Sequence, residues 1–401
     1  MDIIKLLLIF TGIIIVIKYN KPLYMALLVG IIITIGLYRI GPSDSVQLIL
    51  KGTFSRDTIY LVLAFYSITF LQRMLEKRKR IMLAEQSLDN LFNSRRVNAM
   101  VAPFIIGLLP SPGAVLIAAP IVDNAAGEYI TKEERTFVTS YFRHISESFL
   151  PTYSHILLAL SLTSIDMTAF VVAMLPMVAV LFLLGYFVYV RKIPKGGGNT
   201  KKIDKKLEVK NLVTSLWSIA LTITIVLTLK IPVHLAVAPV IILNIIVDKF
   251  KIKEILPMFR SAFELNLIVT TVLIMIFKEA LTFTGVIERL PGYFELLPIS
   301  PVIIFALIFF FGTIVAGSKA IIALTLPLAF ATVPTGGLSL MILLMSISYI
   351  AMQISPTHIC LAIITEHYGT SFIDLVKKTM PVLISFLIIT SIYSFILSVL
   401  F

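Results

Sequence analysis

Cysteine is nearly absent from this sequence: Cys360 is the only one in 401 residues. A single cysteine excludes a disulfide framework, a cysteine-cluster metal site and an iron–sulfur cluster held by cysteines. We therefore expect Cys360 to pack as a small apolar residue, and no organic cofactor is expected.

Charge is also scarce, because only 14% of the residues are charged while 58% are hydrophobic. This excess of apolar residues excludes an ordinary soluble globular protein and indicates an all-α polytopic membrane protein. The formal net charge of +12 is explained by basic cytoplasmic loops of such a protein, so no nucleic-acid partner is expected.

Apolar runs long enough to cross a lipid bilayer recur along the whole chain. The first run is followed by Lys18 and has no small-residue cleavage site, which favours a retained span over a signal peptide. The predicted spans are 3–19, 23–39, 57–75, 137–165, 166–190, 212–229, 231–248, 262–286, 338–365 and 379–400.

Two further apolar segments, 97–122 and 300–332, are interrupted in the middle by "PSPGA" and "AGSKA". Proline and glycine at these points interrupt a helix, so each segment is either a kinked span or a re-entrant hairpin. Only the hairpin arrangement concentrates lysine and arginine on one side of the membrane, as the positive-inside rule requires. It places both termini outside the cell and the basic linker 191–210 in the cytoplasm, in a multi-pass protein of the cell (inner) membrane.

The linker separates two halves, 1–190 and 211–401, that have the same order of elements. Each half contains one hairpin and one long span broken near a proline: 137–165 contains "ESFLPTYSH" and 338–365 contains "QISPTHICL". Five spans in each half would make the second half run upside down relative to the first. Such inverted repeats with paired broken helices are typical of secondary transporters.

The broken helices predict where the binding site lies. Unwound backbone at membrane depth is tolerated only where protein or a water-filled cavity satisfies it. Helix N-termini at the breaks favour an anion, while freed carbonyls and hydroxyls can coordinate a small cation such as sodium. We therefore expect a small anionic solute, most simply an organic carboxylate, coupled to Na⁺ or H⁺.

The layout and the stretches "LLPSPGA" and "QISPTHICLAI" resemble the ion transporter superfamily of divalent-anion/sodium symporters and related carriers, and within it an uncharacterised prokaryotic membrane-protein family. The resemblance implies an elevator-type carrier, usually a homodimer. Better-known relatives carry Ser-Asn-Thr at both hairpin tips, but here the tips read Ser111-Pro112-Gly113 and Ser318-Lys319-Ala320. The loss of asparagine and threonine puts sodium coordination in doubt.

The candidate site residues belong to the hairpin tips and the broken helices. The substrate-binding candidates are Ser111, Gly113, Thr152, Ser318, Lys319, Ser355, Thr357 and His358. The candidates for a coupling ion or a proton relay are His144, Glu147, Ser148 and His155, with a sodium ion placed near Ser111, Ser148 and Thr152.

Each charged candidate also has an alternative interpretation. Lys319 either replaces a cation, pairs with the substrate anion, or extends to the outer surface from a shallow hairpin. Arg143 and Glu147 share a helix face and form either a structural ion pair or part of a proton pathway. The two histidines that follow the prolines, His155 and His358, either bind freed carbonyls or contact substrate.

Two other functions compete with transport. An intramembrane hydrolase would use Ser111 with His155 or His358, but the sequence has neither an HExxH nor a GxSxG motif, and we expect no enzyme activity. A passive anion channel or a non-transporting membrane subunit could share the re-entrant hairpins.

Overall fold

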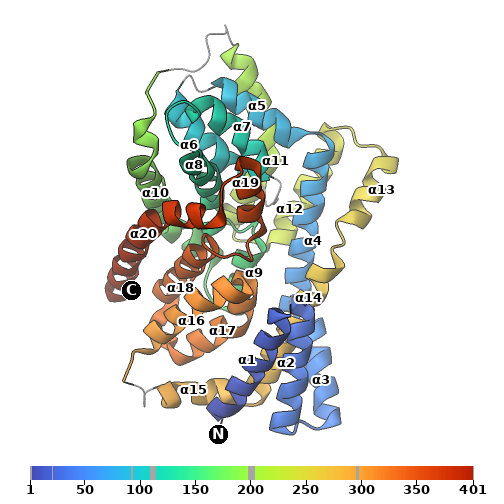
Figure 1. Cartoon of the computed structure of the whole chain (residues 1–401). Helices are drawn as coiled ribbons and strands as arrows, with labels where there is room; N and C mark the ends of the chain where they lie inside the picture. Colours follow the sequence, from blue (N-terminus) through green and yellow to red (C-terminus); the bar gives the residue numbers. More distant parts are fainter. Residues whose placement is uncertain are drawn as a thin grey trace.

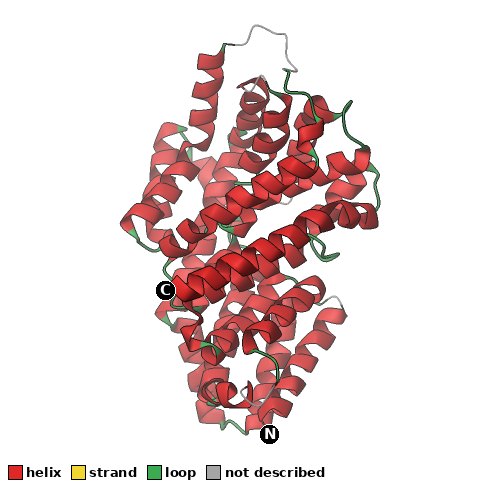
Figure 2. Ribbon diagram, turned by 90° about the vertical axis from the view of Figure 1, so that its left-hand side faces the viewer, coloured by secondary structure: helices red, strands yellow, loops and turns green. Residues whose placement is uncertain are grey.

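The computed structural model of the chain describes residues 2–19, 21–91, 94–108, 114–196, 204–294 and 298–400. Within these ranges the regular structure is entirely helical, and no strand is present (Figure 2). This agrees with the all-α class that the apolar runs predict.

The helices before the linker are α1 (Asp2–Lys18), α2 (Leu23–Tyr38), α3 (Pro42–Phe54), α4 (Arg56–Lys77), α5 (Arg80–Leu91), α6 (Arg95–Ile106), α7 (Ala114–Ala126), α8 (Lys132–His144), α9 (Ser154–Leu162) and α10 (Met167–Val188). Those after it are α11 (Lys205–Leu229), α12 (Val233–Val247), α13 (Ile252–Ser261), α14 (Leu265–Phe283), α15 (Val286–Phe294), α16 (Pro301–Ala316), α17 (Ser318–Thr332), α18 (Gly337–Met352), α19 (Ile359–Tyr368) and α20 (Phe372–Leu400). Three short 3₁₀ turns, η1 (Ile145–Ser148), η2 (Val190–Lys192) and η3 (Pro334–Gly336), complete the described regular structure.

Six stretches in the described residues are long and apolar enough to cross a membrane. They are Arg56–Lys77, Met167–Val188, Lys205–Leu229, Leu265–Phe283, Pro334–Met352 and Phe372–Leu400. Shorter apolar helices, including α2, α12, α16 and α17, accompany them. The chain is thus a multi-pass membrane protein. The predicted spans 137–165 and 338–365 are each divided into two helices, so neither is a continuous span.

The helices form two packed groups (Figure 1). The first group contains the early helices of both halves: α2 and α3 pack on α14, and α12 and α13 pack on α4. The second group contains α6–α10 and α16–α20, with α8 against α20, α9 against α17, and α7 against α19. Figure 1 shows α6, α7 and α8 at one end of the second group and α16, α17 and α18 toward the other.

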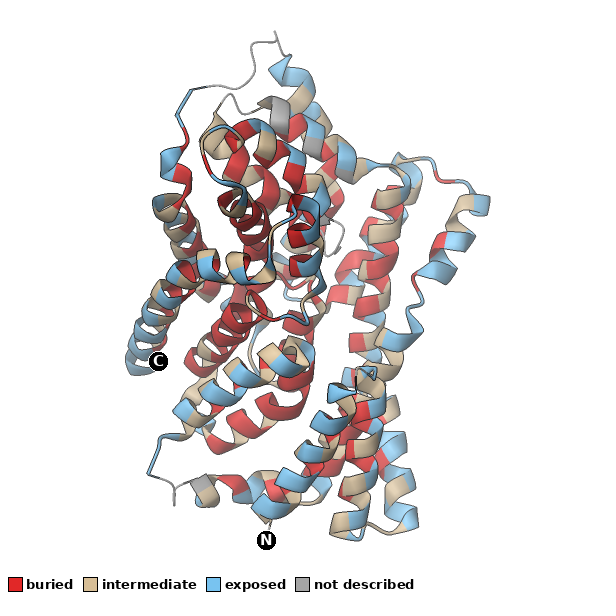
Figure 3. Cartoon of the chain, viewed as in Figure 1, coloured by how far each residue is buried: buried red, intermediate tan, exposed pale blue. Residues whose placement is uncertain are grey.

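The second group contains the most deeply buried helices, α8, α17 and α18, whereas α1, α3 and α13 are largely exposed along one side (Figure 3). Every residue of α8 from Thr136 to His144 is buried. A capping box starts this helix, because the Thr131 hydroxyl accepts a hydrogen bond from the Glu134 N–H while the Glu134 carboxylate accepts one from the Thr131 N–H. The buried part of α8 that follows this cap ends in two polar residues, Arg143 and His144.

A bidentate ion pair joins α13 to the end of α4, outside the long apolar stretches. Arg78 donates to Glu254 at 2.8 and 3.1 Å, and this contact, together with the Lys251 backbone N–H, lowers the pKa of Glu254 from 4.5 to about 2. A carboxyl whose pKa is lower in the folded state stabilises the fold above its unfolded pKa and loses that contribution as the pH falls between the two values.

We therefore expect the thermal stability of the wild-type protein in detergent to decline as the pH is lowered from about 4.5 toward 2 by more than that of Glu254→Gln. Paired melting curves at pH 7 and pH 3 measure this difference. A gap between the two proteins that stays constant over this range would contradict the role assigned to the ion pair.

Candidate functional site

The first broken helix consists of α8, η1 and α9. The α-helix ends at His144, the 3₁₀ turn runs from Ile145 to Ser148, and α9 begins at Ser154. Residues 149–153, around the proline that the sequence predicts to break the helix, do not belong to a helix. The Ser148 hydroxyl donates to the Ile145 carbonyl at 2.7 Å, so the turn satisfies part of its own freed backbone.

The second broken helix consists of α18 and α19, separated by residues 353–358. The Ser355 hydroxyl donates to the Ile314 carbonyl of α16 at 2.8 Å, and it lies 2.7 Å from the Thr357 hydroxyl. It also accepts the Thr357 N–H at 3.2 Å. These contacts hold the break against the end of α16.

The second predicted hairpin consists of α16 and α17, which pack against each other. Only Gly317 separates them, with φ of 81°, a backbone conformation that favours glycine. The turn is therefore tighter than the five-residue break "AGSKA" suggests, and it makes Ser318 and Lys319 the first two residues of α17.

A cavity of about 290 Å³ lies between this tip and the second break. Five of the predicted substrate-binding residues line it: Ser318, Lys319, Ser355, Thr357 and His358. The N-termini of α17 and α19 are both at the cavity, because Ser318 starts α17 and His358 is the N-cap of α19. Two helix N-termini give the cavity a positive potential suited to an anion.

Lys319 supplies the cationic side chain of this cavity. Its side chain is exposed to the cavity, and no carboxylate of the described residues forms an ion pair with it. The ammonium group is therefore available to a ligand.

A buried ion pair joins the end of α8 to η1. Arg143 and Glu147 form the ion pair that their spacing predicts, and both side chains are almost completely buried, at 1% and 6% exposed. Two charges in such a position compensate each other, since either one alone would be costly to bury.

The end of α6 packs against this turn through Gly107. Its carbonyl accepts hydrogen bonds from the Ser146 hydroxyl, at 2.5 Å, and from the Tyr153 hydroxyl. A Cβ atom at this position would overlap the Arg143 carbonyl and lie 2.7 Å from the Ser146 hydroxyl oxygen. Only glycine allows the two backbones to approach so closely.

Replacing Gly107 with alanine is expected to destabilise the protein by about 1–3 kcal/mol, because backbone atoms at the clash cannot move aside as a flexible side chain would. Gly36→Ala in α2 is the matched control, since a Cβ there meets no atom within 4 Å. Chemical or thermal unfolding in detergent measures both variants. Equal effects of the two substitutions would contradict the proposed close approach.

Three histidines of the candidate list lie close to the ion pair. His144 Nε2 is 2.9 Å from His358 Nε2, which joins the first broken helix to the second across 214 residues of sequence. His155 Nε2 donates to the Glu147 backbone carbonyl at 2.9 Å. Of the two interpretations of His155, this contact is the one in which the side chain binds a freed backbone carbonyl. His144 Nε2 also lies 3.9 Å from Glu147 Oε1.

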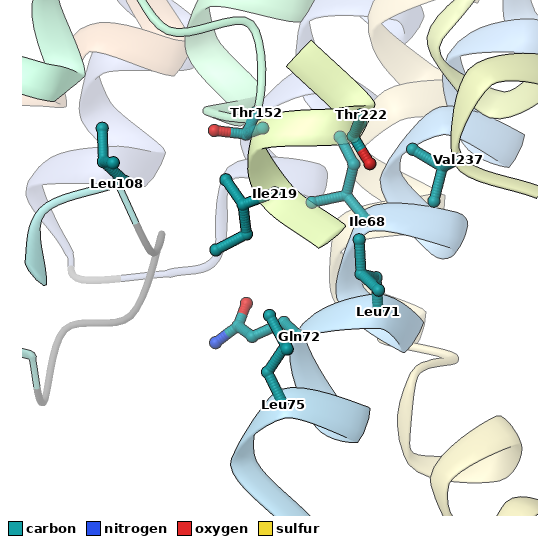
Figure 4. A pocket seen from close by; sticks show the side chains of 9 residues that line it. All are labelled: Ile68, Leu71, Gln72, Leu75, Leu108, Thr152, Ile219, Thr222 and Val237. Carbon is teal, nitrogen blue, oxygen red and sulfur yellow. The ribbon is translucent and has the colours of Figure 1, made fainter. Parts of the chain in front are cut away.

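Thr152 lies on a different, much smaller cavity of about 30 Å³, between the first break and helices α4, α11 and α12 (Figure 4). Gln72, Thr222 and Leu108 line it as well. The hydroxyls of Thr152 and Thr222 are buried without a hydrogen-bond partner in the described part of the chain. A cavity of this size holds about one water molecule.

The structure thus places the described candidates in three locations: the larger cavity, the small cavity with Thr152, and a buried group beside Arg143 that consists of His144, Glu147, Ser148 and His155. The first hairpin tip, with Ser111 and Gly113, lies outside the described residues. The hydrolase hypothesis with Ser111 and the sodium site near it therefore stay predictions. Gly107 and Tyr153 were not predicted from the sequence. A glycine near the end of an apolar run is a signal that could have indicated Gly107, whereas no such signal marks Tyr153.

Comparison with solved structures finds the same fold elsewhere. The crystal structure of the YdaH transporter of Alcanivorax borkumensis, described as having an unusual topology, matches with a TM-score of 0.60 at 10% sequence identity, over 90% of this chain and 89% of that chain. A search of curated proteins finds no match. One protein-family model, described as "Protein of unknown function (DUF401)", covers residues 3–399. The chain therefore belongs to the DUF401 family.

Proposed function

We propose that this protein is a secondary active transporter of a small anion, most simply an organic carboxylate, coupled to Na⁺ or H⁺. The observation that carries the proposal is the 290 Å³ cavity, which combines the Lys319 ammonium, two helix N-termini and the hydroxyls of Ser355 and Thr357. The fold shared with a transporter supports the same function.

An inverted repeat is part of this proposal, and the helix contacts support it. The packing of α2 on α14 has a counterpart in α12 on α4, and α6 on α8 corresponds to α16 on α18. The contacts of α9 with α17 and of α19 with α7 form another such pair. Helices α6–α8 and α16–α18 lie toward opposite ends in Figure 1, as two oppositely oriented halves require. We divide the halves at the 191–210 linker, which we place in the cytoplasm with both termini outside.

Elevator-type movement is the second part of the proposal. Helices α6–α10 and α16–α20 contain both breaks and would move together, while α1–α4 and α11–α14 would form the fixed scaffold and the contact between two copies in a homodimer. We also assign the chain to the ion transporter superfamily. The small cavity at Thr152 is then the counterpart, in the first half, of the larger cavity at Lys319.

Uptake by purified protein in sealed liposomes tests the function. Thermal-shift screening of carboxylates, sulfate and phosphate, with and without Na⁺ and at two pH values, first identifies a ligand by its stabilisation of the folded state. We expect the liposomes to accumulate this ligand against its gradient, and the accumulation to collapse when an ionophore dissipates the Na⁺ or H⁺ gradient. Flux that only runs downhill would indicate a channel instead.

A further inference from the structure

The two histidines that face each other belong to a larger cluster that the anion cavity does not account for. Cys360, the only cysteine of the chain, is the second residue of α19. Its thiol and the two histidine rings offer ligand atoms that all lie within 4.8 Å of one another. His144 comes from α8, whereas His358 and Cys360 come from the second break and the start of α19.

The hydrogen bonding of His144 prepares it as a metal ligand. His144 Nδ1 lies 2.6 Å from the Ser140 carbonyl oxygen, which can only accept, so Nδ1 carries the proton. Its Nε2 therefore directs a lone pair toward His358 Nε2. A backbone carbonyl that binds the second ring nitrogen is the usual support of a metal-bound histidine, because it fixes the tautomer and the ring orientation.

We propose that His144 Nε2, His358 Nε2 and Cys360 Sγ form a binding site for a transition-metal ion of borderline softness, with Zn²⁺ as the expected ligand. Tetrahedral Zn²⁺ with bonds of about 2.0–2.1 Å to nitrogen places two ligand nitrogens about 3.3 Å apart, so the rings at 2.9 Å need only a small separation. Two imidazoles and a thiolate select such ions over Mg²⁺ and Ca²⁺, which prefer oxygen ligands.

One carboxylate lies close to these three side chains. Glu147 Oε1 is 3.9 Å from His144 Nε2, so this carboxylate, which also pairs with Arg143, is a candidate for the fourth coordination position. His358 lines the 290 Å³ cavity and is only partly buried, whereas His144 and Cys360 are buried, so His358 is the ligand that connects the cluster to the cavity. When the ion binds, the Cys360 thiol proton is released to solvent and the thiolate becomes a ligand. The proton that His358 Nε2 donates to His144 Nε2 in the absence of metal moves to His358 Nδ1, which leaves both Nε2 atoms free to coordinate.

A bound ion would join the two broken helices directly, since one ligand comes from the first half and two come from the second. Both broken helices belong to the group that we propose moves as one body. The metal site itself does not depend on the transport proposal, because it rests on the three side chains alone.

Cobalt binding to the purified full-length protein in detergent tests the site. After treatment with a chelator and its removal, Co²⁺ is expected to bind at about one equivalent and to give thiolate-to-cobalt absorption in the near ultraviolet together with tetrahedral bands in the visible. Zn²⁺ should remove these bands by competition, and Mg²⁺ should not. Absence of the near-ultraviolet band from folded wild-type protein would overturn the proposal and leave a direct hydrogen bond between the two histidines.

Variants assign the ligands. The nearly isosteric Cys360→Ser should fold normally and lose the near-ultraviolet band, while His144→Ala and His358→Ala should weaken Co²⁺ binding more than about tenfold, since even loss of a supporting partner has that effect. His367→Ala, an exposed histidine at the end of the same α19 helix, is the matched control and should bind like wild type. A near-ultraviolet band that survives Cys360→Ser, or equal weakening by His367→Ala, would contradict the assignment.

Discussion

Replacing Lys319 with methionine is expected to abolish high-affinity anion binding while the protein still folds. The ammonium group lies at the N-terminus of α17 in the 290 Å³ cavity, without an ion pair to any carboxylate of the described residues, so a bound anion would be its partner. A bound anion would fill the cavity and remove water from the ammonium. Removing one member of such a buried charge pair costs about 2–5 kcal/mol, which corresponds to a loss of affinity of about 30- to 5,000-fold. Methionine keeps the length of the side chain without its charge.

The measurement is the ligand-induced shift in melting temperature, followed by uptake into liposomes. Lys253→Met on α13 is the matched control, because that lysine is exposed and lies outside the cavity. It should retain the wild-type shift and uptake. If Lys319→Met keeps the wild-type affinity, Lys319 does not bind the anion, and its interpretation as a side chain that reaches the outer surface is favoured.

The second large effect concerns Glu147, the partner of buried Arg143. Glu147→Ala leaves the arginine charge in an environment where its side chain is 1% exposed. Breaking a buried ion pair from one side costs about 3–5 kcal/mol, because the remaining charge is uncompensated. We expect Glu147→Ala to unfold at a clearly lower temperature than wild type in the same detergent, in the absence of added metal.

A double substitution separates a structural role from a functional one. In Arg143→Met with Glu147→Leu both charges are replaced by apolar groups of similar size, which is often neutral or stabilising. The double variant should recover most of the lost stability. If it recovers stability but not uptake, the ion pair is needed for transport as well; if the single variant is as stable as wild type, the pair does not hold the broken helix in place.

Local sequence patterns predicted much of what positions the site. Proline and glycine indicated both breaks and the second hairpin, because these residues interrupt a helix irrespective of their neighbours. The spacing of Arg143 and Glu147 indicated their ion pair for the same local reason. The helical class followed from the apolar runs alone.

Contacts between distant segments could not be predicted in this way. The approach of His144 to His358 depends on how α8 and the second break pack in three dimensions, and no local pattern encodes it. The sequence also grouped Thr152 with Lys319, whereas the structure places Thr152 on a separate cavity with α4 and α11. The two breaks nevertheless meet where His144 contacts His358.

Accessibility of position 318 from the two sides of the membrane shows whether the cavity opens alternately to each side, as transport requires. In a Cys360→Ser background, Ser318→Cys gives the protein one thiol at the N-terminus of α17, in the wall of the cavity. A membrane-impermeant maleimide is applied to oriented sealed vesicles. We expect the side from which position 318 is labelled to change with the imposed ion gradient, and we expect the transported anion to slow the labelling. Labelling from the same side under every gradient, with no protection by any anion, would contradict the transport proposal.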